Sequence, residues 1–272
     1  MKDFNPNKTQ LCITAATFSP ASSRNEPTNV VSKSRTLKVM RSALAGIPLL
    51  TPSWVDACLK EGHIVAPSGT MCIRSLPRKH GTAVAARRKV DRGIPTENFG
   101  VARYAANVDK TPLTSSDHLL SGFSVMLCGS SAGSGMVKDL KVLLQQAGAA
   151  IVGSASAACR QLADMEKVEP DCGLERSFVF LCDDSPTDKT CGITDTLFKQ
   201  VKRLIVDSSN TGGTEKVRCV HFNWLFDSIS CASPMKASSY EPVAPRTRAL
   251  WNLTTENRVA NNNSNREKSQ IY

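Results

Sequence analysis

Short apolar runs and amphipathic stretches alternate along the sequence, separated by turn-forming residues. In the first amphipathic stretch, Leu37, Met40 and Leu44 recur at the spacing of one helix face, and Gly46 follows where helices commonly stop. Residues 47–50 are a short apolar run of the kind that parallel sheets bury on both faces. The pattern predicts a helix that leads into a buried strand.

A second helix is predicted directly after this strand. Thr51 is a suitable N-cap, Pro52 occupies the first helical position, and Gly62 supplies the stop. Trp54 lies in the first turn, so we expect its large side chain to anchor the helix to the core. Upstream, residues 9–18 are predicted to form a strand.

The second half of the sequence repeats the alternation more completely. Strands are predicted at residues 123–128, 149–152, 177–182 and 217–220, and helices at residues 136–147, 194–206 and 221–229. The residues between 153 and 176 are expected to form a loop. Trp224 occupies the same place in the last helix as Trp54 does in the first half, and we expect it to be buried.

Alternating helices and short buried strands indicate an α/β fold in which each unit has a four-stranded parallel sheet flanked by helices. The first unit, residues 9–77, shows only the last strand-helix-strand-helix portion of this order. Residues 78–118 are expected to be a basic linker and residues 119–242 a complete unit. The polar residues 243–272 are expected to be a disordered tail.

The net charge of +10 is concentrated outside the predicted folded units. Residues 74–103 contain eight Lys and Arg residues and two acidic residues, and the tail is also basic. Proteins that bind DNA duplexes strongly usually carry their charge on a folded face, so we expect DNA contact to be auxiliary at most. Arg78-Lys79 and Arg87-Arg88-Lys89 resemble a split nuclear-localisation signal, with a solubilising linker as the alternative.

The cysteines do not form a recognisable metal motif. The ten cysteines contain no C-x-x-C pair, and Cys172, Cys182, Cys191 and Cys219 are spaced too irregularly for a typical zinc module. We therefore expect reduced cysteines in an intracellular protein and no cofactor. The longest apolar stretch, residues 43–50, is too short to span a bilayer, and the first residues lack the apolar region of a signal peptide.

The sequence from Ser34-Arg-Thr-Leu-Lys38 through Ala45-Gly-Ile-Pro-Leu-Leu-Thr-Pro-Ser-Trp-Val55 resembles the C-terminal half of a BRCT domain. Residues 148–152 and the helix of Trp224 resemble a second BRCT repeat. The pair is similar to the tandem BRCT regions of DNA-damage checkpoint mediators and of the breast-cancer susceptibility protein. The resemblance implies a nuclear, non-enzymatic adaptor that binds phosphoserine proteins.

In that family, a serine or threonine, a backbone N–H and a lysine hold the phosphate. The resemblance places the lysine at Lys38, beside Thr36, and places at Arg35 the arginine that contacts the backbone of the peptide. Physical chemistry favours the same residues, because a doubly charged phosphate needs a cation and N–H donors, which the start of a helix supplies. A solvated helix face with ordinary charges is the alternative interpretation.

The sequence departs from the family pattern in the first repeat, which lacks the opening strand, helix and second strand that normally complete the pocket. Two explanations stay open: the chain is a piece of a longer product, or the first repeat is degenerate and phosphate binding is weak or lost. The second repeat has its own candidate residues, Gly129, Ser130 and Lys199. A phosphate-independent scaffold is the alternative function.

The same loop, Gly129-Ser-Ser-Ala-Gly133, has the G-x-S-x-G form of a serine-hydrolase elbow between a strand and a helix. Ser131, Asp207 and His221 would follow the hydrolase order of nucleophile, acid and histidine. The sequence upstream does not supply the strands that such a sheet needs, so a tight turn is the favoured interpretation and the hydrolase a remote alternative.

The chain ends in Lys268-Ser-Gln-Ile-Tyr272, which is similar to the tail of the histone variant phosphorylated at DNA breaks. We also expect a phosphorylated tail of that kind to be a partner of the protein. We expect Ser269 to be the target of a Ser-Gln-directed kinase and the modified tail to occupy a BRCT pocket, with chance similarity in a polar tail as the alternative.

Overall fold

The computed structural model describes eleven ranges of the chain: residues 11–19, 29–33, 35–73, 75–76, 94–95, 118–129, 135–167, 177–182, 193–210, 217–231 and 233–253. They belong to two compact units. The first comprises Met1–Lys79, Ala86–Leu119 and Leu225–Met235, and the second His80–Ala85, Leu120–Trp224 and Lys236–Tyr272. Within the described ranges, no helix combines the length and apolar character that crossing a membrane requires.

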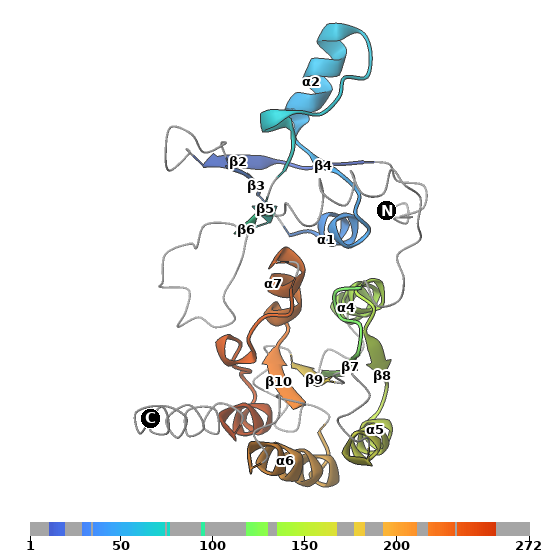
Figure 1. Ribbon diagram of the computed structural model, residues 1–272, viewed down its shortest axis with the longest axis vertical. Helices are drawn as coiled ribbons and strands as arrows, with labels where there is room; N and C mark the ends of the chain where they lie inside the picture. The colour runs from blue at the N-terminus through green and yellow to red at the C-terminus, as the bar shows by residue number, and fades with distance from the viewer. Residues whose placement is uncertain are drawn as a thin grey trace, which may run out of the picture. The chain divides into compact units, whose positions relative to one another are not determined.

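The second unit is built on a four-stranded parallel sheet (Figure 1). Its strands, in the spatial order β10-β9-β7-β8, are β7 (Phe123–Cys128), β8 (Ala150–Val152), β9 (Ser177–Cys182) and β10 (Val217–His221). All six residues of β9 are buried, as an inner strand that is covered on both faces requires. The parallel sheet predicted for this half of the chain is confirmed.

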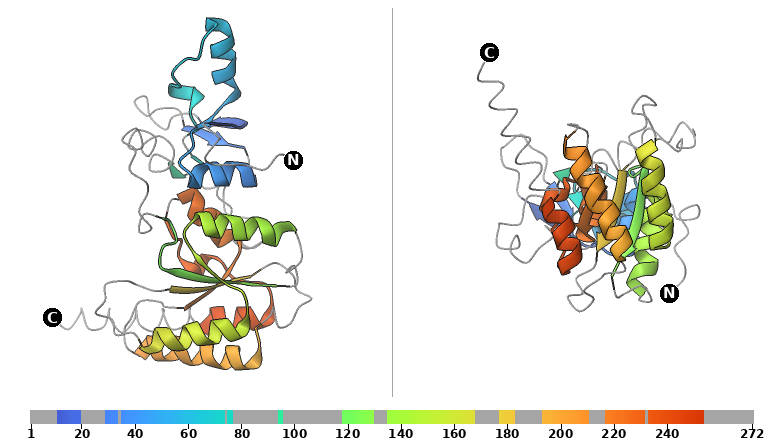
Figure 2. Two further views of the ribbon diagram at one scale, coloured as in Figure 1. Left: turned by 90° about the vertical axis from the view of Figure 1, so that its right-hand side faces the viewer. Right: turned by 90° about the horizontal axis from the view of Figure 1, so that it is seen from below.

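Helices cover both faces of this sheet (Figure 2). Helix α4 (Gly135–Gln146) connects β7 to β8 and lies on one face, whereas α5 (Ala155–Lys167) and α6 (Asp195–Asn210) lie on the other. The chain moves outward from β7 to β8 and then returns to the opposite side of β7, so right-handed crossovers place α4 on one face and the later helices on the other. Helix α7 (Asn223–Cys231) follows β10.

Trp224 is fully buried, as predicted, and its ring lies 6.1 Å from that of Phe123. The α4 side of the core also holds Leu140, Leu143 and Leu144, which share the apolar face of the helix. Burying an aliphatic side chain of this size is worth about 1.5–3 kcal/mol. The predicted amphipathic face of residues 136–147 is therefore the face that the sheet buries.

Helix α5 replaces the loop that was expected between residues 153 and 176. The helix begins after Ser154, whose side chain accepts a hydrogen bond from the N–H of Ala157 at 3.2 Å. Its buried positions, Ala158 and Leu162, are contiguous with the core between the sheet and α6. The sequence contains the signal for this helix, because Ala155, Ala158 and Leu162 recur at helical spacing, and the expectation of a loop overlooked it.

Ordered structure also extends into the expected disordered tail. Residues 245–253 form a helix in which Thr247 and Leu250 are fully buried. The indole N–H of Trp251 donates to the carbonyl of Ala237 at 3.1 Å, in the short 3-10 turn η6 (Ala237–Ser239). The prediction of disorder is therefore wrong for residues 243–253, and the rest of the expected tail, with Ser269, lies outside the described residues.

The first unit contains small sheets rather than part of one four-stranded parallel sheet. Strand β1 (Cys12–Ile13) pairs in parallel with β4 (Leu49–Leu50). A separate mixed sheet has the order β2-β3-β5-β6 and consists of β2 (Ala16–Ser19), β3 (Asn29–Ser32), β5 (Ser75–Leu76) and β6 (Ile94–Pro95). Strand β6 lies in the segment predicted to be linker, so that prediction is wrong at this position.

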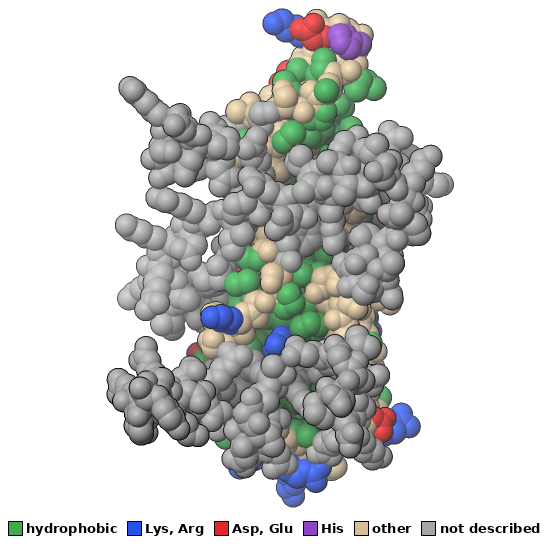
Figure 3. Space-filling view, viewed as in Figure 1, with side chains coloured by type: hydrophobic (Ala, Val, Ile, Leu, Met, Phe, Trp, Pro, Cys, Tyr) green, Lys and Arg blue, Asp and Glu red, His purple; other side chains and the backbone are tan. Residues whose placement is uncertain are grey.

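The two helices predicted in the first unit are present as α1 (Leu37–Leu44) and α2 (Pro52–Glu61). Helix α1 buries Met40 and Leu44, as the apolar spacing indicated, together with Val39, whereas Leu37 is half-buried. Helix α2 buries none of its residues, and Figure 3 shows apolar side chains exposed along it. Trp54 is only half-buried, and its indole N–H donates to the carbonyl of Val65 at 2.9 Å, so it holds the segment after the helix rather than a core.

Candidate functional site

The start of helix α1 brings together Thr36 and Lys38, two of the predicted phosphate-binding residues. Thr36 is the N-cap, with its hydroxyl 3.4 Å from the N–H of Val39 and its carbonyl accepting from Met40 at 3.0 Å. Lys38 is exposed in the first turn, which contains no acidic residue. The positive end of the helix dipole and the lysine charge therefore add, and this end of the helix favours an anion.

Arg35 has partners inside the first unit. Its side chain is 8% exposed and forms an ion pair with Asp227, whose side chain is 0% exposed. Its guanidinium also lies 5.4 Å from the ring centroid of Phe226. These contacts connect the residue before α1 to the part of α7 that belongs to the first unit.

Asp227 was not singled out from the sequence, although the sequence contains a signal for it. It is the acidic residue within the otherwise apolar stretch Trp224-Leu-Phe-Asp227, and a carboxylate buried by such neighbours needs a compensating cation. The identity of that cation depends on the path of the chain, because Arg35 lies 192 positions away.

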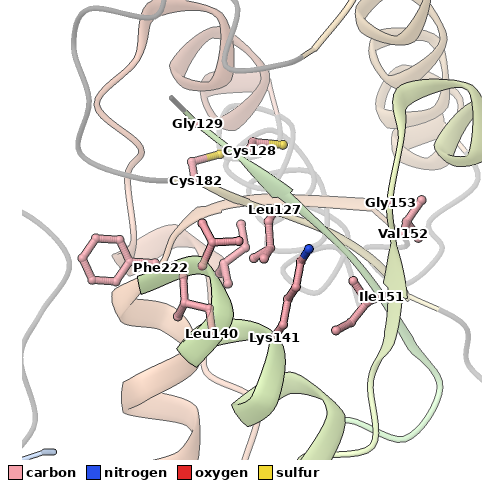
Figure 4. Close-up of a pocket in the computed structure, with 12 residues that line it drawn as sticks. Leu127, Cys128, Gly129, Leu140, Lys141, Ile151, Val152, Gly153, Cys182 and Phe222 are labelled. Atoms are coloured by element: carbon pink, nitrogen blue, oxygen red, sulfur yellow. The ribbon is translucent and has the colours of Figure 1, made fainter. Parts of the chain in front are cut away.

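A pocket of about 120 Å³ opens at the carboxyl ends of the strands in the second unit (Figure 4). The chain adds β8 on one side of β7 and β9 on the other, so β7 and β9 flank a topological switch point. Open α/β sheets commonly bind ligands outside the strand ends at such a point. Most of the lining is apolar. The lining residues are Leu127, Cys128, Gly129, Val137, Leu140, Lys141, Ile151, Val152, Gly153, Leu181, Cys182 and Phe222.

Lys141 supplies the positive charge among these lining residues. Figure 4 shows its side chain rising from α4 toward the sheet, with its amine between Leu127 and Ile151. Lys141 follows Val137 by one helical turn and therefore lies on the apolar stripe of α4. That position was the signal that the sequence offered, and our sequence reasoning missed it.

The structure includes only part of the trio predicted for the second repeat. Gly129 lines the pocket, Ser130 lies outside the described residues, and Lys199 is exposed on α6 and absent from the pocket lining. Helix α6 lies on the sheet face opposite α4 (Figures 1 and 2). The cation beside Gly129 in this pocket is therefore Lys141.

A cluster of cysteines lies at the same end of the sheet. The register pairs Cys128 with Cys182 and Cys182 with His221, and the sulfur atoms of Cys182 and Cys219 are 3.8 Å apart. Burial raises the pKa of Cys182, but hydrogen bonds from the side chains of Cys128, Cys219 and Thr247, with the nearby charge of His221, lower it to about 5. The sulfur atoms of Cys128 and Cys182 lie on the side of the strands away from Leu140 (Figure 4).

Of the three predicted hydrolase residues, the structure describes the side chain of His221. Ser131 and the side chain of Asp207 lie outside the described residues. His221 is 1% exposed, and its Nδ1 accepts a hydrogen bond from the N–H of Asn223 at 3.2 Å. The two basic clusters of the expected linker also lie outside the described residues.

The described part of the chain contains no group of three or more His, Cys, Asp or Glu residues arranged to hold a metal ion. No protein-family model matches the sequence, and no curated protein matches it significantly. The resemblance to tandem BRCT domains therefore depends on the sequence stretches around Arg35, Trp54 and Trp224 themselves.

Proposed function

We propose that the protein is a non-enzymatic nuclear adaptor of the tandem BRCT type, which binds phosphoserine peptides of DNA-damage checkpoint proteins. Its partners are phosphorylated proteins, among them the tail of a damage-phosphorylated histone variant, and its basic segments make auxiliary contacts with DNA. The proposal combines the sequence resemblance with the anion-favouring start of α1. The four-stranded parallel sheet of the second unit is compatible with it.

The observation that carries the proposal is the position of Lys38. Lys38 is exposed two residues after the N-cap Thr36, at the positive end of an eight-residue helix with no first-turn carboxylate to neutralise it. A cation at this end of a helix opposes the dipole and costs stability, so its presence is explained when an anion binds there. A phosphate monoester supplies the charge and the acceptor oxygens that this arrangement favours.

In this proposal Arg35 positions the site. Its charge is compensated by Asp227 within the first unit, which fixes the residue that precedes the N-cap. A backbone fixed on one side of Thr36 holds the helix start in place and lowers the conformational entropy that peptide binding would otherwise cost. The direct peptide contact expected for Arg35 stays a prediction.

The proposal is tested by fluorescence anisotropy with a phosphoserine peptide library and its unphosphorylated twin. Charge-assisted hydrogen bonds are worth about 1.5–3 kcal/mol, so we expect Lys38→Met to weaken binding of the selected phosphopeptide about ten- to a hundredfold. Lys60→Met removes an exposed lysine from the last turn of α2 and is the matched control. Equal affinity for phosphorylated and unphosphorylated peptides would support the phosphate-independent scaffold instead.

A further inference from the structure

The size of the pocket in the second unit limits what it can hold. Its volume is about 120 Å³. An engineered apolar cavity of about 150 Å³ binds benzene, whereas small-molecule sites commonly measure about 300–1,000 Å³. The pocket is therefore large enough for one aliphatic or aromatic side chain and too small for a nucleotide or a typical cofactor.

The chemistry of the lining limits further which group the pocket can bind. Leu127 and Ile151 are half-buried, so part of the apolar lining faces solvent rather than other protein atoms. Burial of such surface by an incoming apolar group contributes about 25 cal/mol per Å². Lys141 adds one positive charge at the edge of this apolar surface. The complementary group is an apolar side chain with a negative charge beside it.

The site is also accessible to a peptide at Gly153. A Cβ atom built on this glycine meets no atom within 4 Å, so open space lies where its side chain would be. Gly153 follows the last residue of β8 at the same strand-end crevice as Gly129. An extended chain can approach the backbone here without a side chain in its path.

We propose that this pocket is a docking site for an acidic partner peptide, which inserts one apolar side chain beside Leu127 and Ile151 and pairs a neighbouring carboxylate with Lys141. The site needs no phosphate and lies within the second unit, and Lys38 takes no part in it. It therefore adds to the proposed phosphopeptide binding and does not depend on it.

The test uses the full chain with labelled leucine and isoleucine methyl groups and follows their NMR signals. The probe is acetyl-Gly-Gly-Asp-Leu-Asp-Gly-Gly-amide, which offers a carboxylate on either side of the leucine. Two matched peptides replace both aspartates by asparagine or the leucine by alanine. We expect the Asp-Leu-Asp peptide to shift the signals of Leu127, Leu140 and Ile151 saturably, and the other two peptides to bind more weakly.

Four variants separate the contributions of the lysine charge, the open space at Gly153 and the phosphate site. Lys141→Gln is expected to weaken binding of the Asp-Leu-Asp peptide about two- to fivefold, as the loss of an exposed ion pair predicts, while Lys138→Gln on the same helix leaves it unchanged. Gly153→Leu places a side chain in the open space at the pocket and should weaken binding at least tenfold. Lys38→Met should leave this binding unchanged even though it is expected to weaken phosphopeptide binding.

Several results would overturn the proposal. These are the absence of a saturable methyl shift with Asp-Leu-Asp, equal binding of Asp-Ala-Asp, or equal binding by Lys141→Gln and Lys138→Gln. Methyl shifts that depend on protein concentration without peptide would assign the pocket to a second copy of the chain and would also refute it. Wild-type-like binding by Gly153→Leu would show that the peptide binds elsewhere.

Discussion

The ion pair between Arg35 and Asp227 gives the sharpest prediction for stability. The change is Asp227→Asn, which keeps the shape of the side chain and removes its charge. Because the side chains of Arg35 and Asp227 are 8% and 0% exposed, the guanidinium would be left with little access to water. Breaking a buried pair in this way typically costs about 3–5 kcal/mol.

An exposed ion pair in the same chain provides the control for this cost. Arg248 and Glu241 form an ion pair in which the side chains are 55% and 27% exposed. Exposed pairs contribute about 0–1 kcal/mol, so Glu241→Gln should be close to neutral. The double variant Arg35→Met/Asp227→Leu should recover most of the loss, because replacing a whole buried pair with apolar residues is often neutral.

Hydrogen exchange with mass spectrometry at increasing urea concentration measures the loss of stability in the first unit separately from the second. Peptides that cover residues 35–44 and 225–235 report the opening of the first unit, and peptides of β9 report the second. We expect Asp227→Asn to lower the opening free energy of the first set by about 3–5 kcal/mol. A loss no larger than that of Glu241→Gln would refute the assignment of a desolvated pair.

Three further predictions concern the helices and the cysteine cluster. Leu162→Ala in α5 should lower the free energy of unfolding by about 2–5 kcal/mol, whereas Leu59→Ala, at a side chain that is 76% exposed, should be nearly neutral in the same urea titration. Gly62 has a φ of 70°, so Gly62→Ala should cost about 1–2 kcal/mol, and Gly153→Ala should not; equal thermal midpoints for the two variants would contradict this. The pKa of Cys182 is lowered from 9.0 to about 5 in the folded chain, so its stabilising contribution is full above pH 9.0 and is lost as the pH falls through about 5. The stability gap between wild type and Cys182→Ala should therefore widen from pH 5 to pH 9, and a constant gap would refute the shift.

The sequence predicted the elements whose periodicity is strong and local. Strands β7 and β9 have the bounds that their apolar runs indicated, and α1 ends just before Gly46, the stop that the sequence predicted. Helix α5 was missed although Ala155, Ala158 and Leu162 recur at helical spacing. The helix at residues 245–253 was missed because its few buried side chains are dispersed among polar ones.

The candidate sites also combine features that local sequence predicts with features that only distant packing creates. Local pattern alone predicts that Lys38 lies near the start of a helix, because helical spacing depends on neighbouring residues, whereas the structure shows Thr36 to be the N-cap. The sequence by itself could not pair Arg35 with Asp227 or turn Lys141 toward a pocket at the ends of three strands. Those arrangements depend on how distant segments pack, and tertiary packing decides them because the free energy of a buried charge or an open cavity is set by neighbours in space rather than in sequence.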